Sequence, residues 1–341
     1  MYCPNARLDC MVLEGARILV TGGTGSIGSE IVRQLLERGP EHILVLSRDD
    51  SKHFYFQQEM AQQSNVGFMI GDVRDRESLS RAFQTGIDVV IHAAALKHVL
   101  ICEQNPTEAV KTNILGTQNV VDLAKANGVT IMMTISTDKA VSPTSTMGAS
   151  KFVAERLTID GDLSSGTRCS CVRFGNVLGS RGSVIPSFVM GIRERGGVWI
   201  SDPAVTRFAM PIPDAAKLVL DAVEMSNGGE IFVLRMKAFS IEQLLRVIKN
   251  MSFAANGFDV EQKGLVRAEK LHEDLITIEE APRLWETEHH YIVAPPIGEW
   301  TPVNGAIKSN LDEFCSNHAE MYSDHDLQIE IQASIDALGL D

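Results

Sequence analysis

Short apolar runs alternate with amphipathic stretches over most of the chain, and this alternation predicts the secondary structure. The runs at 16–20, 42–46, 66–70, 88–91, 131–135, 170–173 and 230–234 have the length and aliphatic character of buried parallel strands. Helical patterns are found at 29–38, from about 76, and at 112–127, 213–224, 240–250 and 329–338. Strands that alternate with helices predict an α/β fold, a Rossmann-like doubly wound parallel sheet with a smaller C-terminal substrate-binding domain.

The same pattern predicts how the chain is divided. We expect 1–14 to be an N-terminal extension, 15–180 with about 205–236 to form a dinucleotide-binding domain, and 181–204 with 237–341 to form a substrate-binding region. The run at 230–234 is expected to be the last strand of the sheet, and 206–208 a further strand or edge. Ser240 is expected to cap the helix that follows it.

The composition limits the possible partners. The 341 residues carry a formal net charge of −13, which argues against nucleic acid or an anionic membrane; an anionic substrate stays possible because backbone amides and a few arginines can bind it. The six cysteines (Cys3, Cys10, Cys102, Cys169, Cys171, Cys315) form no C-x-x-C pair and no metal-ligand spacing, so we expect reduced thiols, no metal and a cytoplasmic location. No signal peptide is found, and no apolar run approaches the ~20 residues that span a bilayer, so membrane insertion is not expected.

A glycine-rich loop, T-G-G-T-G-S-I-G, connects the first predicted strand to the first predicted helix. It places Gly22, Gly25 and Gly28 in a G-x-x-G-x-x-G spacing, with Ser26 and Ile27 between the last two. Glycine lets the backbone turn tightly and approach a pyrophosphate, which then lies at a helix N-terminus. A plain glycine turn is the alternative, but the position between a strand and a helix favours a dinucleotide site.

Later strand ends supply further cofactor candidates. Ser47 and Arg48 precede two aspartates after the second strand. Since an arginine here accommodates the 2′-phosphate of NADP and an acidic residue binds the ribose of NAD, we favour NADP and keep NAD possible. The next two strand ends contribute Asp72, Val73, Ala93, Ala94 and Lys97.

Each of these candidates has a simpler alternative. Asp72 can cap the helix that begins near residue 76. Lys97 contacts substrate or cofactor, or is a solvated surface lysine. His92 is expected to be packed and hydrogen-bonded. Asn113 either ties its helix to the strand that bears Thr137 or is a core amide.

The fifth predicted strand ends in Ser136, Thr137, Asp138 and Lys139. In doubly wound sheets, ligands bind beyond the carboxyl ends of the strands, so this hydroxyl, carboxylate and amine can all reach one ligand. A solvated loop pair is the alternative for Asp138 and Lys139. The next helix starts with Met147 and Lys151, which lie four apart and therefore on one helix face.

Several motifs occur in order: T-G-G-T-G-S-I-G, G-D-V-R-D, H-A-A-A-L-K-H-V, K-T-N-I-L-G-T, S-T-D-K-A and G-N-V-L-G-S-R-G-S-V. Together they resemble the extended short-chain dehydrogenase/reductases. More narrowly, they resemble the nucleotide-sugar 4,6-dehydratases that act on UDP-N-acetylglucosamine in bacterial surface-glycan pathways. The resemblance covers roughly 16–293.

The resemblance implies a reaction and assigns roles in it. The superfamily has a Tyr-x-x-x-Lys motif where this chain has Met147 and Lys151, and a thioether cannot exchange a proton. The resemblance assigns Lys139 as the base at C5 of the sugar and Asp138 as the acid at O6. Thr137 and Asp138 could then handle O4 in place of the tyrosine, and Lys151 would hold the nicotinamide ribose. We expect burial beside a cationic nicotinamide to lower the pKa of Lys139, and a closed site to raise that of the acid.

The resemblance also implies substrate contacts and a branch of the family. The substrate candidates are Lys97, Met147, Asn176, Arg181, Ser183, Arg207, Arg267 and Glu269. A structural loop is the alternative for the glycine-rich segment 174–186, and a charged surface helix for 267–273, where Ala268 stands at a position usually occupied by glycine. A methionine branch of the family resembles dehydratases that retain the C5 configuration. Its members often carry membrane-spanning N-termini, and we expect none from the residues of this sequence.

The expected function is therefore an NAD(P)-dependent hydro-lyase, a UDP-N-acetylglucosamine 4,6-dehydratase that supplies a surface glycan or a nonulosonic acid. One rival is a nucleotide-sugar epimerase of the same fold, although such an enzyme normally relies on the missing tyrosine. Another is a non-catalytic dinucleotide sensor, which would have little need for Asp138 and Lys139. A homo-oligomer is expected by resemblance, whereas the donor nucleotide (UDP or GDP) and the stereochemistry at C5 stay open.

Overall fold

The computed structural model describes residues 12–163, 166–180, 182–337 and 339, so Cys3, Cys10, Arg181 and most of the predicted N-terminal extension lie outside the described residues. Its centre is a ten-stranded sheet of order β16-β14-β15-β10-β6-β5-β4-β1-β2-β3. In chain order these strands are β1 (Arg17–Thr21), β2 (His42–Ser47), β3 (Val66–Ile70), β4 (Val89–His92), β5 (Ile131–Ile135), β6 (Arg168–Arg173), β10 (Ile231–Leu234), β14 (Leu284–Glu286), β15 (His290–Val293) and β16 (Ile307–Lys308). The strands from β3 to β10 are paired in parallel, which confirms the predicted fold class.

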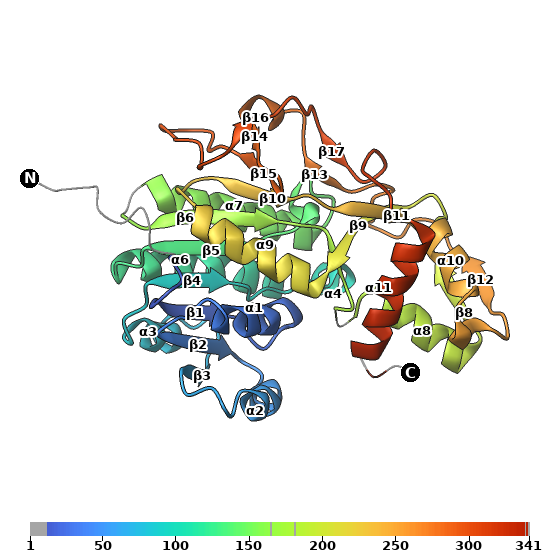
Figure 1. Ribbon diagram of the computed structural model, residues 1–341, viewed down its shortest axis with the longest axis horizontal. Helices are drawn as coiled ribbons and strands as arrows, with labels where there is room; N and C mark the ends of the chain where they lie inside the picture. The colour runs from blue at the N-terminus through green and yellow to red at the C-terminus, as the bar shows by residue number, and fades with distance from the viewer. Residues whose placement is uncertain (1–11, 164–165, 181, 338, 340–341) are drawn as a thin grey trace, which may run out of the picture.

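Helices cover both faces of this sheet. The helices and helical turns are α1 (Ser26–Leu36), α2 (Asp50–Glu59), α3 (Arg76–Phe83), α4 (Val99–Gln104), α5 (Pro106–Ala109), η1 (Val110–Leu115), α6 (Gly116–Ala126), η2 (Asp138–Ala140), α7 (Thr146–Leu163) and α9 (Ile212–Met225). Helices α1 and α9 pack on the face that is nearer the viewer, and α3 and α6 pack on the other, with α7 beside α6 (Figure 1). The order β3-β2-β1-β4-β5-β6 places the switch in chain direction between β1 and β4, which is where this sheet type binds ligands.

The prediction that 230–234 forms the last strand is wrong. Strands β15, β14 and β16 continue the sheet beyond β10, and all three pair antiparallel. They have four, three and two residues, too few for a hydrophobic period to be recognised. Part of the predicted substrate-binding region therefore completes the first sheet.

A second hydrophobic cluster lies beyond the carboxyl ends of the parallel strands. It is built from α8 (Val184–Arg195), α10 (Ile241–Lys249) and α11 (Asp324–Ala337), with β7 (Asn176–Leu178), β8 (Gly197–Ile200), β9 (Thr206–Pro211), β11 (Lys237–Ser240) and β12 (Asp259–Gln262). The remaining short elements are η3 (Ser252–Ala254), η4 (Ala281–Arg283), β13 (Asp274–Ile276) and β17 (Phe314–Cys315). Figure 1 shows α8, α10 and α11 together at one end of the molecule, next to the ends of the central strands.

Most predicted elements are found within a few residues of their expected ends. The strands predicted at 66–70 and 131–135 have these bounds in the structure. The Ser240 hydroxyl accepts a hydrogen bond from the Gln243 amide at 3.0 Å, which confirms the predicted cap. Helix α1 begins at Ser26 because the glycine turn ends at Gly25. The last helix begins five residues before its predicted start, since the Ser323 hydroxyl accepts the Asp326 amide and caps it there. The expected alternative of a surface helix at 267–273 is wrong, because this segment is irregular.

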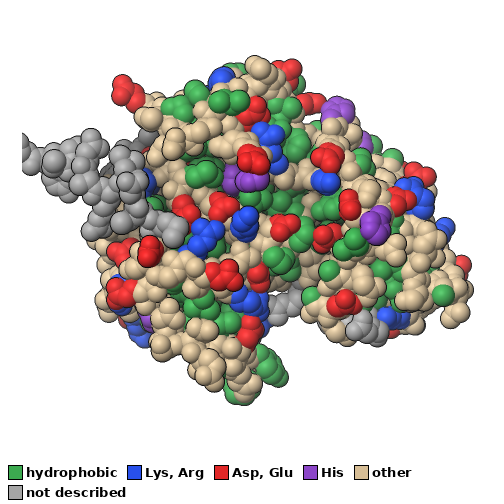
Figure 2. Space-filling view, in the orientation of Figure 1, with side chains coloured by type: hydrophobic (Ala, Val, Ile, Leu, Met, Phe, Trp, Pro, Cys, Tyr) green, Lys and Arg blue, Asp and Glu red, His purple; other side chains and the backbone are tan. Residues whose placement is uncertain are grey.

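Charged side chains of both signs are spread over the face in Figure 2, with apolar side chains between them. Within the part of the chain described, none of the helices combines the length and the apolar character that crossing a bilayer requires. Cys102, Cys169, Cys171 and Cys315 are free thiols. Among the described residues, no group of three or more His, Cys, Asp or Glu side chains could hold a metal ion.

Candidate active site

The glycine loop forms a cradle at the N-terminus of α1. Gly22 has φ +70°, and a Cβ on it would lie 2.7 Å from the amide nitrogen of Ala94. A Cβ on Gly28 would lie 2.4 Å from the Gly22 carbonyl oxygen. The N-cap residue of α1 is Gly25, which has no side chain to bond the backbone amides of the first turn. This geometry fits a dinucleotide, because its pyrophosphate can approach the bare backbone at the positive end of the helix dipole.

Three hollows meet along the carboxyl ends of the strands and contain nearly all the predicted site residues. The central one, about 570 Å³, is lined by Gly22, Gly25, Ser26, Ile27, Gly28, Ala93, Lys97, Thr137, Lys139, Met147, Lys151, Asn176 and Ser183, among others. The second, about 250 Å³, shares Gly22, Gly25 and Ala93 and adds Ser47, Arg48, Asp72, Val73 and Ala94. The third, about 220 Å³, shares Lys139 and Asn176 and adds Arg207, Arg267, Glu269 and Glu273. The shared residues join the three hollows into one continuous site.

The second hollow has the character of an adenosine site. The Ser47 hydroxyl lies 2.8 Å from the Thr24 hydroxyl and 2.9 Å from Nε2 of His53, which orients it at the end of β2. Arg48 is half exposed, with Nη1 3.8 Å from Oδ2 of Asp72, so it can turn toward a phosphate. The Asp49 carboxylate instead accepts the Lys52 amide at 3.0 Å and caps α2.

The reactive cluster lies where β5 ends and η2 begins. Asp138 is fully buried and lines none of the three hollows, which differs from the expectation that its carboxylate faces the ligand directly. The Thr137 hydroxyl donates to Oδ1 of Asp138 at 2.7 Å, and Nζ of Lys139 donates to the same oxygen at 3.0 Å. Nζ of Lys139 also lies 3.3 Å from Oδ1 of Asn176. Asp138 can therefore exchange protons with a ligand only through Thr137 and Lys139.

The charges around Lys139 act against the expected lowering of its pKa. Burial alone would lower the pKa of Lys139, but the Asp138 and Glu273 carboxylates more than offset this, so the pKa lies above its ordinary value. Glu273, whose Oε1 is 3.5 Å from Nζ, is the site residue that the sequence patterns did not single out. Its pKa is raised by burial, against the opposing effect of Lys139. It ends the segment 267–273, which resembles a family pattern, R-x-G-E-K-x-H-E, loosely and with shorter spacing, and that final position was the signal that could have identified it.

Helix α7 brings Met147 and Lys151 to the same hollow. Met147 is almost fully buried and packs with Cys102 and Ala109, so it fills space where the related enzymes place a tyrosine. Nζ of Lys151 donates to the Ile135 carbonyl at 2.6 Å, and burial lowers its pKa. Lys151 is thus fixed at the end of β5, within reach of a ligand in the central hollow.

Buried polar residues hold the loops around this cluster. His92 lies between the hydroxyls of Thr21 and Thr117, so it is packed and hydrogen-bonded as predicted, and burial lowers its pKa to about 3. The prediction that Asn113 ties its helix to the strand bearing Thr137 is wrong. Its side chain instead bonds the amide and the carbonyl of Leu96, at 2.8 and 3.0 Å, and the Ser150 hydroxyl. Asn113 therefore fixes the loop that carries Lys97.

The substrate candidates cluster at the third hollow and at the start of α8. Ser183 is the N-cap residue of α8, and its buried hydroxyl has no hydrogen-bond partner in the structure. Arg207 donates to Glu269 at 3.0 Å and to the backbone at Thr206 and Leu271, so its guanidinium is held before any ligand arrives. Arg267 is exposed at the rim. A helix N-terminus in the central hollow and two arginines in the adjoining third hollow are groups that suit a diphosphate.

The backbone of this segment is strained at Ala268, which has φ +67°. We predict that Ala268→Gly raises the free energy of unfolding by about 0.5–1 kcal/mol. The change removes the steric strain of a Cβ in the left-handed region, and this gain is larger than the cost of the extra conformational entropy that glycine has in the unfolded chain. Ala255→Gly is the matched control, since Ala255 is exposed at φ −59° and should lose stability instead. Urea unfolding followed by circular dichroism tests both; equal losses would contradict the strain argument.

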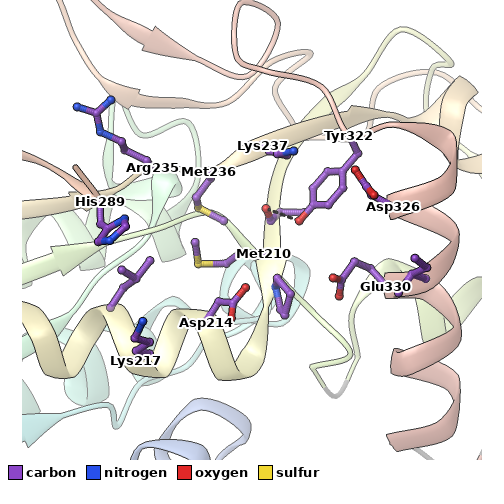
Figure 3. A pocket seen from close by; sticks show the side chains of 14 residues that line it. Met210, Asp214, Lys217, Arg235, Met236, Lys237, His289, Tyr322, Asp326 and Glu330 are labelled. Carbon is purple, nitrogen blue, oxygen red and sulfur yellow. Dashed lines mark hydrogen bonds between the residues drawn. The ribbon is translucent and has the colours of Figure 1, made fainter. Parts of the chain in front are cut away.

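A further hollow, about 460 Å³, lies outside this site, between the end of β9, α9, the segment 235–237 and α11 (Figure 3). The labelled side chains there are of mixed charge, with Asp214, Asp326 and Glu330 facing Tyr322 and with Lys217 and Arg235 on the opposite side. None of the residues predicted from the sequence to form the site lines it. It has no connection through shared residues with the hollow that contains Lys139.

Comparisons with known proteins agree with this geometry. The model of the family described as "Polysaccharide biosynthesis protein" matches residues 18–295. An uncharacterised membrane protein of Methanocaldococcus jannaschii is 48% identical over 82% of this chain and 85% of its own length. A UDP-N-acetylglucosamine 4,6-dehydratase (inverting) of Campylobacter jejuni is 41% identical over 82% of this chain and 83% of its own.

A UDP-glucose 4-epimerase of Rickettsia rickettsii is 39% identical over 80% of this chain and 81% of its own, so the relatives include both dehydratases and epimerases. Among solved structures, Pen from Bacillus thuringiensis is 36% identical, superposes with a TM-score of 0.88, and is matched over 94% of this chain and 98% of its own. The match extends over both the sheet and the second hydrophobic cluster.

Proposed function

Because the chain belongs to the polysaccharide biosynthesis protein family, within the extended short-chain dehydrogenase/reductases, we propose that it is a UDP-N-acetylglucosamine 4,6-dehydratase. The observation that carries the proposal is the Asp138–Lys139 pair, joined at 3.0 Å at the end of β5 in a site continuous with a dinucleotide cradle. An elimination needs an acid and a base at one sugar. Lys139 lines the site directly, and Asp138 reaches it through Thr137. The product would be a UDP-2-acetamido-2,6-dideoxy-hexos-4-ulose, for a surface glycan or a nonulosonic acid.

The proton steps follow from the side chains present. A nicotinamide dinucleotide, when bound, accepts hydride from C4 of the sugar and returns it to C6. Thr137 takes the O4 proton and passes its own proton to Asp138, the base it already contacts at 2.7 Å. The resulting 4-ketone makes the C5 proton acidic, and Lys139 as the free amine removes it. Asp138 then returns its proton through Thr137 to the departing O6, which leaves as water. Once C6 has received hydride, the Lys139 ammonium gives a proton back to C5 and is again the free amine.

The remaining residues bind and orient. Lys151 holds the nicotinamide ribose, and Met147 packs beside it without taking a proton. The α8 N-terminus with Ser183, Arg207 and Arg267 binds the nucleotide diphosphate. We assign NADP as the cofactor because Ser47 and Arg48 line the adenosine end, and because Asp49, which lines it as well, is held as a helix cap. A cytoplasmic homo-oligomer remains part of the proposal.

A sugar 4-epimerase is the second candidate, favoured by the epimerase among the relatives. An epimerase of this fold passes the O4 proton through a tyrosine on α7, and Met147 stands at that position. It also has no task for an amine that takes a proton from C5. The two reactions leave different products, so one experiment separates them.

We predict that the purified protein, incubated with UDP-N-acetylglucosamine in deuterium oxide, forms a product lighter by one water that carries deuterium at C5. NMR and mass spectrometry measure both, and the coupling of the C5 proton in a matched light-water reaction reports retention or inversion. Formation of UDP-N-acetylgalactosamine without loss of water would establish the epimerase. Turnover of a guanosine donor alone would change the substrate, and cofactor binding without any turnover would indicate a sensor.

A further inference from the structure

Glu273 is a buried carboxylate beside the reactive lysine, and the mechanism above gives it no task. It directly precedes β13, it is 4% exposed, and its backbone amide donates to the Ser316 hydroxyl at 2.9 Å. Its Oε1 lies 3.5 Å from Nζ of Lys139 and 4.0 Å from Nε of Arg207. Its Oε2 is buried and makes no hydrogen bond in the structure. Burying a carboxylate oxygen without a hydrogen-bond partner costs free energy. Its presence here therefore calls for an explanation, and a function in the reaction would provide one.

The chemistry of Lys139 creates the need for a proton acceptor. Lys139 must be a neutral amine before it can take the C5 proton, yet between two carboxylates it is held as an ammonium ion. Asp138 cannot take up the lysine proton, because it has to accept the O4 proton through Thr137 in the same turnover. Glu273 is the other carboxylate that the structure places within 4 Å of Nζ.

Substrate binding would drive the proton toward Glu273. Burial is the largest influence on both groups: it disfavours the ammonium form of Lys139 and the carboxylate form of Glu273. A ligand that fills the hollow removes more water from both, which strengthens this influence in each case. A neutral amine beside a neutral carboxyl is then favoured over a buried ion pair.

We propose that Glu273 receives the proton that Lys139 must lose before it removes the C5 proton, and so controls how much of Lys139 is in the amine form. In this step one N–H bond of the ammonium breaks and one O–H bond forms on Glu273, so charge and atoms balance without a further reactant. Glu273 acts through Lys139 and is a positioning residue rather than a catalytic one. The inference rests on the proposed dehydratase function.

Other charges around the pair belong to three elements. Asp138 faces Lys139 from η2, Arg207 faces Glu273 from β9, and Lys270 lies on the same segment as Glu273. Arg207 is paired with Glu269 at 3.0 Å and Lys270 with Asp274 at 3.3 Å. The charges of Arg207 and Lys270 are thus partly neutralised by these partners. A change at Glu273 therefore acts mainly on its interaction with Lys139.

The test is Glu273→Gln, which keeps the size of the side chain and removes its ability to take a proton. Turnover at pH 7 is expected to fall by ~10²-fold. It should then rise about tenfold per pH unit above pH 7, because Lys139 must lose its proton to water, whereas the wild type should be nearly flat over that range. Reduction of the bound cofactor, followed by its absorbance in a single turnover, should persist while deuterium exchange at C5 slows. Retained cofactor reduction also shows that the variant is folded.

Glu320→Gln is the matched control, since it makes the same chemical change at an exposed carboxylate whose partner is Lys237 and not Lys139. It should keep wild-type turnover and pH profile. Wild-type turnover and pH profile in Glu273→Gln would overturn the inference. So would equal losses of cofactor reduction and C5 exchange with no change in pH dependence, because that is the result of a purely structural role. If the wild type itself forms no 4-keto product, the proposed function fails instead.

Discussion

Lys139→Ala is expected to lower turnover of UDP-N-acetylglucosamine by ~10²–10⁴-fold, the usual contribution of a general acid or base. Without the amine, no other side chain in the described site is placed to take the C5 proton, since Met147 cannot and Lys151 is bonded to the Ile135 carbonyl. Asp138→Asn should have an effect of similar size, because it removes the acceptor for the O4 proton. The two variants are distinguishable: Lys139→Ala should still reduce its cofactor in a single turnover, and Asp138→Asn should not.

Single-turnover absorbance and C5 deuterium exchange measure these steps separately. Lys111→Ala is the matched control, because Lys111 is an exposed lysine that pairs with Glu108 on the surface. It should behave as the wild type does. Unchanged turnover in both Asp138→Asn and Lys139→Ala would disprove the mechanism even if the dehydratase reaction were established.

The fold was predictable because its parallel strands carry a strong local signal. Each central strand is a short run of buried aliphatic residues, and the glycine loop identifies the first turn of the sheet. The antiparallel extension was not predictable, because its strands are short and are stabilised by pairing with β10 rather than by their own pattern. Strand ends shifted by one or two residues for the same reason: the neighbouring strand, not the local sequence, decides where pairing stops.

The candidate site was predictable as a list of residues but not as a geometry. The motifs identified Thr137, Asp138 and Lys139, and all three meet at the end of β5. The sequence could not reveal that Asp138 lies beneath the surface and reaches the hollow only through its neighbours. Nor could it reveal that Glu273, 134 residues after Lys139 in the chain, lies against it, since that contact depends on how the segment before β13 packs on the core of the large sheet.

A buried ion cluster connects the segment that carries Glu273 to the loop that carries Thr137, Asp138 and Lys139. The Arg173 guanidinium binds Glu155 through two bonds of 2.8 and 3.1 Å and Glu280 through two of 2.9 and 3.1 Å. It also donates to the Leu275 carbonyl at 2.8 Å, two residues after Glu273. Glu155 in turn accepts the Ser136 hydroxyl at 2.6 Å, immediately before Thr137. One arginine therefore holds both sides of the site in position.

We predict that Arg173→Met lowers the free energy of unfolding by ~3–5 kcal/mol, because it leaves two buried carboxylates without a partner. The pH dependence should also change sign. In the wild type, burial would raise the pKa of Glu280, but Arg173 more than offsets this, so the pKa lies below its ordinary value. The folded protein therefore loses stability as the pH falls through that lowered pKa. In Arg173→Met, burial acts on Glu280 without the opposing arginine, so Glu280 favours the protonated form and stability should rise as the pH falls from 7 toward 5.

Urea unfolding at several pH values tests this. The matched control is the triple variant Arg173→Met/Glu155→Gln/Glu280→Gln, which has no buried carboxylate in the cluster. In it the pH effect should disappear and part of the lost stability should return. Arg38→Met is a second comparison, since Arg38 also binds two carboxylates, Asp221 and Glu224, but in a partly exposed position where water replaces the lost partner. A loss in Arg173→Met no larger than in Arg38→Met would show that the buried cluster does not govern stability. If stability is lost as predicted and turnover falls further than the folded fraction does, the cluster also positions the loop that carries Thr137, Asp138 and Lys139.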